Sequence, residues 1–169
     1  MYMNCYCGNQ QPFEECCDLI ISGVNVAVSP EQIMRSRYSA YATKNAAYIY
    51  QTYASSSKKE QSIQEIQSWA EETQWLKLTI KHSDYIKNID NSVDKELLLP
   101  TVEFCALYIH NKTFYQMSEV SRFTLENHQW RYADGDIAEH IEISHPKRNE
   151  PCLCQSNKKF KHCCSSKLA

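Results

Sequence analysis

The sequence has few glycines and no long apolar run. Three glycines in 169 residues leave no glycine-rich loop of the kind that cradles phosphates. No apolar stretch approaches the roughly 20 residues that a membrane-spanning helix needs. The first four residues lack the basic and apolar regions of a signal peptide, and a net charge of −2 gives no general case for nucleic-acid binding. We therefore expect a soluble cytoplasmic protein.

Cysteine, by contrast, is frequent and regularly spaced. Eight of the nine cysteines follow one pattern twice, Cys-x-Cys, eight residues, Cys-Cys; they are Cys5, Cys7, Cys16, Cys17, Cys152, Cys154, Cys163 and Cys164. Four thiolates on so short a segment can surround one tetrahedral Zn²⁺ at a Zn–S distance of about 2.3 Å. Metal binding would supply the folding energy that so small a segment cannot gain by burial. The spacing predicts two structural zinc ions, and one thiol of each adjacent pair is open to a spare or exchangeable role.

Disulfide bonds are the alternative use of these cysteines, since four thiols allow three pairings. The absence of a secretory signal and the clustering at the two ends favour zinc. His162 precedes the last cysteine pair and could replace one thiolate, although a surface role among the neighbouring lysines is favoured. Cys105 stands apart, and we expect it to be a small buried apolar residue in a strand.

The segment 151–164 begins Pro-Cys-Leu-Cys and ends Lys-Lys-Phe-Lys-His-Cys-Cys. It resembles the SEC-C motif, the small zinc-binding segment at the C-terminus of the SecA translocation ATPase. The double arrangement is similar to the YchJ-like family, which carries one such motif at each end of a central domain. Further matching stretches are 34–41, 73–79, 121–123 and 130–135. The resemblance implies a nuclear-transport-factor-2-like (cystatin-like) central domain, a cone with an open end.

The sequence departs from the family pattern within both motifs. Tyr6 and Leu153 stand where the family usually has proline, and the usual Gly-Ser-Gly turn is altered at 8–10 and 155–157. Asn157 can adopt a left-handed conformation, which would keep the second turn. The first copy has acidic residues at 14–15 where the family has lysines, so we do not expect it to share a partner-binding role.

The central region predicts helices followed by strands, which indicates an α+β fold. Ser29, Asn45 and Ser62 are expected N-caps, the first and last within capping boxes completed by Gln32 and Glu65. Strands are expected at 75–81, 101–110, 113–125 and 130–133, the second central and the last ended by 134–135. Loops are expected at 55–59 and 90–94, and a linker at 140–150. These elements suggest an N-terminal knuckle at 1–24, a central domain at 25–146 and a C-terminal knuckle at 147–169, with a central domain that folds without the knuckles.

Charged and aromatic residues in the central region are candidates for a pocket. Those we single out are Arg37, Tyr38, Glu103, Arg122, Trp130 and Asp134. For each charged residue, a surface or ion-paired role is the simpler reading. Glu119 and Arg122 lie three apart on one strand, so they should face opposite sides unless a bulge intervenes. No catalytic triad or histidine metal pattern is evident.

Two functions fit these features. In the first, the protein is a zinc-binding interaction module, and the basic residues Lys158, Lys159 and Lys161 of the C-terminal knuckle touch an acidic protein surface or RNA; resemblance to the SecA tail suggests translation or export machinery. In the second, the central pocket binds a small ligand or acts as an enzyme, and the zinc ions are structural because a four-thiolate site leaves no position for water. Convergence of Glu103, Arg122 or Asp134 in a deep cavity would favour the enzyme, and an aromatic filling would favour the adapter.

Overall fold

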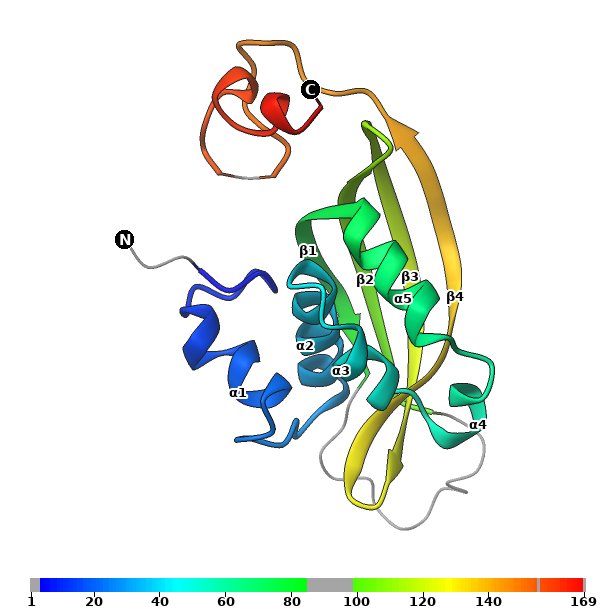
Figure 1. Ribbon diagram of the computed structural model, residues 1–169. Helices are drawn as coiled ribbons and strands as arrows, with labels where there is room; N and C mark the ends of the chain where they lie inside the picture. The colour runs from blue at the N-terminus through cyan, green and yellow to red at the C-terminus, as the bar shows by residue number, and fades with distance from the viewer. Residues whose placement is uncertain (1–3, 85–98, 155, 169) are drawn as a thin grey trace.

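The computed structural model describes residues 4–84, 99–154 and 156–168. The helices come first: η1 (Phe13–Glu15), α1 (Cys17–Ile21), α2 (Pro30–Ala42), α3 (Ala46–Gln51), α4 (Ser55–Lys58) and α5 (Ile63–Glu72). The strands follow: β1 (Thr73–Ser83), β2 (Thr101–His110), β3 (Thr113–Glu126) and β4 (Gln129–Ile143), and then η2 (Phe160–His162) and η3 (Cys164–Leu168). Helices packed on a curved antiparallel sheet confirm the predicted α+β class (Figure 1). The loop expected at 90–94 lies outside the described residues.

Side-chain caps begin the three main helices, as predicted. Ser29, Asn45 and Ser62 each accept a hydrogen bond from the backbone N–H three residues later, at 3.2, 3.0 and 3.3 Å. Neither predicted capping box is closed, because among the described residues no backbone N–H of Ser29 or Ser62 donates to the side chain of Gln32 or Glu65. The Gln32 side chain accepts from the N–H of Val28 at 2.9 Å, one residue before the N-cap. These caps are local in sequence, which is why the pattern alone could find them.

The short helix α4 corrects the loop predicted at 55–59. Its first turn is capped from a distant strand: the Glu126 carboxylate accepts from the N–H of Ser55 at 2.9 Å and from its hydroxyl at 2.7 Å. A carboxylate at a helix N-terminus satisfies free N–H groups and complements the helix dipole. Because the cap comes from β3, the local sequence does not reveal it.

The four strands form one antiparallel meander in the order β1-β2-β3-β4. Two-residue turns join the last three strands, and both central residues of each turn have positive φ: 47° and 61° at Asn111 and Lys112, 50° and 62° at Asn127 and His128. Turns of this hand match the twist of paired strands. β2 lies between β1 and β3, which confirms its predicted central position.

Strand β4 is longer than the sequence predicted. The expected end at 134–135 and the expected linker from residue 140 are both wrong, because β4 stays paired with β3 as far as the partners Phe114 and Ile143. Most of its second half is exposed, including Ile137 and Ile141. Backbone pairing with β3 therefore sustains this edge strand where its side chains look like those of a linker.

A bulge in β1 changes which side chains face the helices. The pairing with β2 shifts between Trp75 and Lys77, so Trp75 and Leu78 both belong to the core beneath the helices, while Leu76 packs on the opposite face. Simple alternation along the strand expected at 75–81 would place Trp75 and Leu78 on different sides, and the bulge removes that alternation. The bulge brings an indole ring into the helix-side core.

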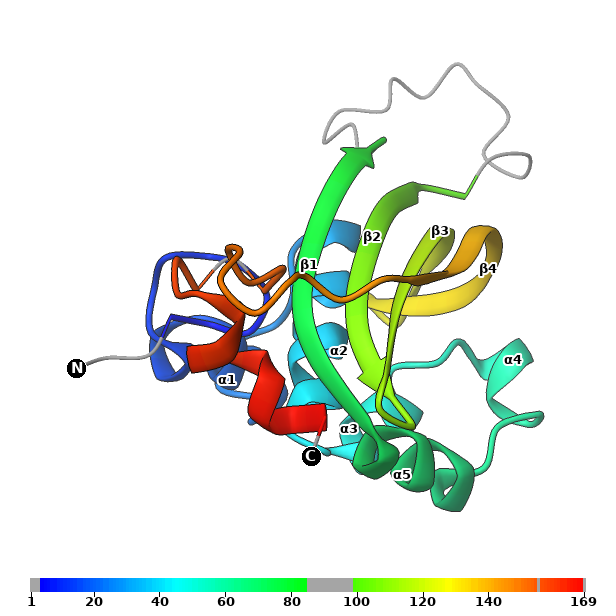
Figure 2. The same ribbon diagram turned by 90° about the horizontal axis from the view of Figure 1, so that it is seen from above.

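Each face of the sheet carries its own apolar core. The larger core lies under α2, α3 and α5 and includes Ile33, Ile49, Phe104 and Phe123. The smaller core lies on the outer face and includes Leu107, Ile109 and Phe114. The N-terminal knuckle lies beside α2, and the C-terminal knuckle lies beyond one end of the sheet (Figures 1 and 2). The two cysteine groups therefore belong to different apolar cores.

Candidate metal centres and neighbouring cavities

The structure brings the eight clustered cysteines together in two groups of four. Within each group, all sulfur atoms lie within 4.8 Å of one another. Tetrahedral zinc with Zn–S bonds of about 2.3 Å would hold its sulfurs about 3.8 Å apart. The Sγ atoms of Cys7 and Cys16 are 3.8 Å apart, and those of Cys163 and Cys164 are 3.9 Å apart. All nine cysteines are free, so the disulfide alternative receives no support.

The two groups are built by the same local fold, 147 residues apart. The N–H of Cys5 donates to the carbonyl of Gln11 at 2.8 Å, and the N–H of Cys152 donates to that of Lys158 at 2.9 Å. A 3₁₀ turn then begins at a phenylalanine in both copies, and the N–H of the third cysteine donates to the carbonyl of that phenylalanine. The two terminal cysteine segments therefore form a structural repeat, although their turns and charges differ.

The third cysteine of each group meets a polar side chain at the same position of the repeat. Asn9 donates its side-chain N–H to the Sγ of Cys16 at 3.4 Å, and the Ser156 hydroxyl lies 3.1 Å from the Sγ of Cys163. Both sulfurs belong to half-buried residues. Asn157 has the predicted left-handed conformation, with φ of 58°. His162 is exposed and does not belong to the sulfur cluster.

Close packing of the thiols spreads their pKa values apart. Hydrogen bonds from Cys17 and Cys7 hold the pKa of Cys5 well below its usual range, and the same contact with Cys5 raises the pKa of Cys17. Burial opposes ionisation of Cys154, yet hydrogen bonds with Ser156, Cys163 and Cys152 lower its pKa to about 6. A bound cation would be needed to hold several thiolates together in either group.

The N-terminal group is part of the main core. Cys5, Cys7 and Cys17 are 3%, 0% and 2% exposed and belong to the same apolar cluster as α2. The Sγ of Cys5 lies 3.7 Å from the Ser39 hydroxyl, and the Arg35 guanidinium donates to the carbonyl of Cys7 at 2.7 Å. The N-terminal knuckle and α2 therefore share one core. The expectation that residues 25–146 fold without this knuckle stays a prediction, and the shared core argues against it.

The C-terminal group packs on the outer face of the sheet instead. Phe160 is buried between Phe114, with ring centroids 6.1 Å apart, and the stacked ring of His145 at 5.4 Å. Lys158 and Lys159 are exposed, and Lys161 is half-buried. Of the ion pairs among the described residues, none involves these lysines. The knuckle thus packs on the sheet through apolar side chains and presents basic side chains to solvent.

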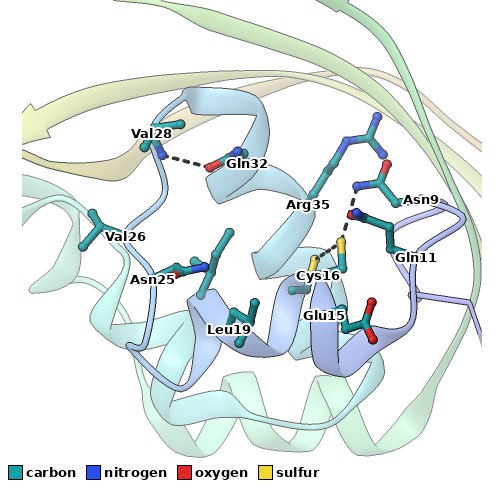
Figure 3. Close-up of a pocket in the computed structure, with 12 residues that line it drawn as sticks. Asn9, Gln11, Glu15, Cys16, Leu19, Asn25, Val26, Val28, Gln32 and Arg35 are labelled. Atoms are coloured by element: carbon teal, nitrogen blue, oxygen red, sulfur yellow. Dashed lines mark hydrogen bonds between the residues drawn. The ribbon is translucent and has the colours of Figure 1, made fainter.

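A groove of about 560 Å³ runs beside the first cysteine group, between α1 and α2. Figure 3 shows that it is bordered by the amide side chains of Asn9, Gln11, Asn25 and Gln32 and by Cys16. Val26 and Val28 lie along the segment that joins the two helices and are 55% and 57% exposed. The groove therefore combines apolar side chains with groups that both donate and accept hydrogen bonds.

A second cavity, of about 300 Å³, lies between α2 and the helix-side face of the sheet. Arg37 and Tyr38, both singled out from the sequence, line it. The other sequence candidates lie elsewhere: Trp130 borders a separate hollow of about 210 Å³, Glu103 pairs with Lys81 at 3.5 Å, and Arg122 pairs with Asp134 and Asp136. Glu103, Arg122 and Asp134 therefore do not converge in this cavity.

Glu119 is the acidic residue of the cavity, and it was not among the pocket candidates chosen from the sequence. It lies among the cavity-lining side chains, while Arg122 lies on the outer face, so the two face opposite sides as expected. The signal that could have found Glu119 is its spacing from Ser121, because same-face residues of a strand lie two apart. The two side chains are hydrogen-bonded at 2.6 Å.

Comparisons with known proteins agree with this architecture. The family described as YchJ, middle NTF2-like domain, matches residues 29–135, and the SEC-C motif matches residues 148–166. The class is therefore a SEC-C motif protein with a nuclear-transport-factor-2-like domain. None of the described helices is long and apolar enough to cross a membrane.

Full-length relatives establish the family. A UPF0225 protein of Vibrio cholerae is 35% identical over 162 residues, which cover 96% of this chain and 99% of the relative. A UPF0225 protein of Enterobacter is 36% identical over 160 residues, covering 95% and 96%. The chain belongs to this YchJ family.

Solved structures show the same fold. The solution structure of a SEC-C motif-containing protein from Rhodopseudomonas palustris is similar with a TM-score of 0.68 and 28% identity, covering 81% of this chain and 100% of that one. A crystal structure of a SEC-C motif-containing protein from Psychrobacter arcticus gives a TM-score of 0.62 at 22% identity, covering 97% and 96%.

Proposed function

We propose that this protein is a zinc-binding interaction module of the bacterial cytoplasm. Its C-terminal knuckle would dock on an acidic partner, protein or RNA, of the translation or protein-export machinery. The main support is a set of lysines, two exposed and one half-buried, that form no ion pair with a described residue and lie on a lobe whose apolar side packs against the sheet. Such a lobe has one face for its own fold and one for a partner. The partner class rests on analogy with the SecA tail.

Zinc is the proposed metal because the donors are four sulfurs. Thiolate sets of this kind select zinc among the common structural ions, whereas magnesium and calcium prefer oxygen. A zinc ion with four thiolates carries a formal charge of −2, so nearby basic groups offset part of it. The metal would therefore be structural, and the exposed lysines would be the binding groups.

The first prediction concerns metal content. Protein prepared under reducing conditions should contain about two zinc ions per chain, one for each four-sulfur group. Elemental analysis together with a thiol count tests this. A value near zero with oxidised thiols would contradict the zinc proposal, and a value near one would assign metal to a single knuckle.

The two knuckles differ in charge, which predicts different roles. Glu14 and Glu15 of the first copy are exposed in the loop where the second copy has Lys161 and its neighbours. Two surfaces of opposite charge are poorly suited to the same partner. We propose that the first knuckle serves the fold and the second serves binding.

Changing Lys158, Lys159 and Lys161 to Glu should abolish docking. Zinc content and thermal unfolding should stay as in the wild type, because none of the three forms an ion pair with a described residue. Binding of the wild type should weaken as salt rises to roughly 0.2 M, where surface charges are well screened. Co-sedimentation with purified ribosomes and pull-down with the purified export ATPase measure this.

The matched control carries the same charge change on the central domain. Lys44, Lys59 and Lys112 are exposed, and changing them to Glu alters the net charge by the same amount. This control should bind like the wild type. Equal loss of binding in both triple variants would show a net-charge effect, and retained binding in the knuckle variant would refute docking through the basic knuckle.

A further inference from the structure

The cavity beneath α2 has an aromatic wall. Tyr38, Tyr41, Trp69, Trp75 and Phe104 line it, together with two methionines. Tyr38 and Tyr41 both lie against the ring of Trp75, with centroids 5.4 and 5.3 Å apart. Walls built from flat rings favour a flat ligand, which can stack on them. A volume of about 300 Å³ is at the lower end of small-molecule sites.

Glu119 supplies an acceptor on one side of this cavity. Its Oε1 accepts from the Ser121 hydroxyl at 2.6 Å and from the Tyr132 hydroxyl at 3.0 Å. A Cβ atom at Gly135 would lie 2.2 Å from this oxygen, so the absence of a side chain there makes room for the carboxylate. Of the residues that the structure describes, none donates to Oε2. The carboxylate is thus held in place with one oxygen left to accept a further hydrogen bond.

A cationic donor also belongs to the cavity lining. The Arg37 guanidinium lies 4.4 and 4.6 Å from the ring centres of Tyr53 and Tyr132, and its Nη1 donates to the carbonyl of Ile49 and the hydroxyl of Thr52. Its other nitrogens make no hydrogen bond to a described residue. The indole N–H of Trp75 is buried and has no partner among the described residues. With almost no accessible surface, this N–H is closed to a ligand, so Arg37 is the donor that the cavity offers.

We propose that this cavity binds a neutral, planar nitrogen heterocycle that carries an N–H donor beside a carbonyl acceptor. The formal charges of Arg37 and Glu119 cancel, which disfavours a ligand with net charge. Glu119 accepts the ligand N–H, and the ligand carbonyl accepts from Arg37. The aromatic wall stacks on the ring. This binding is independent of docking through the C-terminal knuckle.

A series of compounds with a flat two-ring core tests this on the full-length, zinc-loaded protein. The probes are 2-quinolone, which has adjacent N–H and C=O groups, naphthalene, which has neither, and 2-naphthoate, which is an anion. Binding is followed by quenching of tryptophan fluorescence and by ligand-observed NMR. We expect 2-quinolone to bind at least about tenfold more tightly than either of the others, because a site with buried polar groups rejects ligands that leave them unpaired.

Variants locate the site. Glu119→Gln keeps the shape but places an N–H donor where the ligand N–H must be accepted, so it should weaken 2-quinolone binding about tenfold and leave naphthalene unchanged. Glu103→Gln is the matched control, because it makes the same change on the outer face of the neighbouring strand, where Glu103 meets Lys81. Ser121→Ala, which removes a hydroxyl that fixes Glu119, should give a smaller loss.

The outcomes separate clearly. Equal affinities for 2-quinolone and naphthalene would show an apolar cavity and overturn the proposal. Preference for 2-naphthoate would assign the cavity to anions through Arg37 and also overturn it. Binding of 2-quinolone that Glu119→Gln does not weaken, in a variant whose melting temperature matches the wild type, would place the ligand elsewhere. The comparison of wild-type affinities decides the ligand class even where a variant folds poorly.

Discussion

Replacing Cys7 by serine should destabilise the whole protein by more than about 4 kcal/mol, the range reached when a structural metal is lost from a core. Cys7 is fully buried, and its carbonyl accepts the hydrogen bond from Arg35 of α2. Losing the metal at this position would leave the neighbouring sulfurs either to repel one another as thiolates or to take up protons within the apolar cluster of the helices. The zinc content should fall by one ion per chain.

The structural repeat supplies the matched control. Cys154 occupies the same position in the C-terminal group, but it is half-buried and that group packs on the smaller core of the outer face. Cys154→Ser should also remove one zinc ion while changing the stability of the central domain by no more than about 1 kcal/mol. Urea unfolding followed by tryptophan fluorescence measures this, because all three tryptophans belong to the central region. Equal destabilisation by both variants would contradict the assignment of the first group to the core.

Features that depend on neighbouring residues were predictable from the sequence. The cysteine spacing places four ligands on one short segment, and the N-caps at Ser29, Asn45 and Ser62 act on N–H groups three residues away. Each of these features is fixed by chain geometry over a few residues, so the sequence contains the whole signal.

Features that depend on distant partners were not predictable in the same way. The α4 cap comes from Glu126, 71 residues away, and β4 continues because β3 offers it a pairing edge. The role of Glu119 depends on Tyr132 and on the missing side chain at Gly135, both on the adjacent strand. Strand preference is largely set by such tertiary contacts, which single-sequence patterns do not contain.

Replacing Arg37 by alanine should cost about 4 kcal/mol of folding free energy. Arg37 is 4% exposed, and its Nη1 donates to Ile49 at 2.8 Å and to Thr52 at 2.6 Å, which ties α2 to the end of α3. Hydrogen bonds from a charged group contribute about 1.5–3 kcal/mol each, and stacking of a desolvated cation on aromatic rings adds about 2 kcal/mol. The site relaxes around the smaller side chain, which offsets part of this loss of folding free energy.

Arg122→Ala is the control that separates burial from charge. Arg122 pairs with two carboxylates, those of Asp134 and Asp136, and these bonds hold the pKa of Asp136 below its usual value. The pairs are nevertheless open to solvent on the outer face, where water replaces a lost partner, so stability should change little. Thermal and urea unfolding of the two variants give the comparison. If Arg122→Ala proved as destabilising as Arg37→Ala, the number of ion pairs rather than burial between Tyr53 and Tyr132 would govern the stability of this domain.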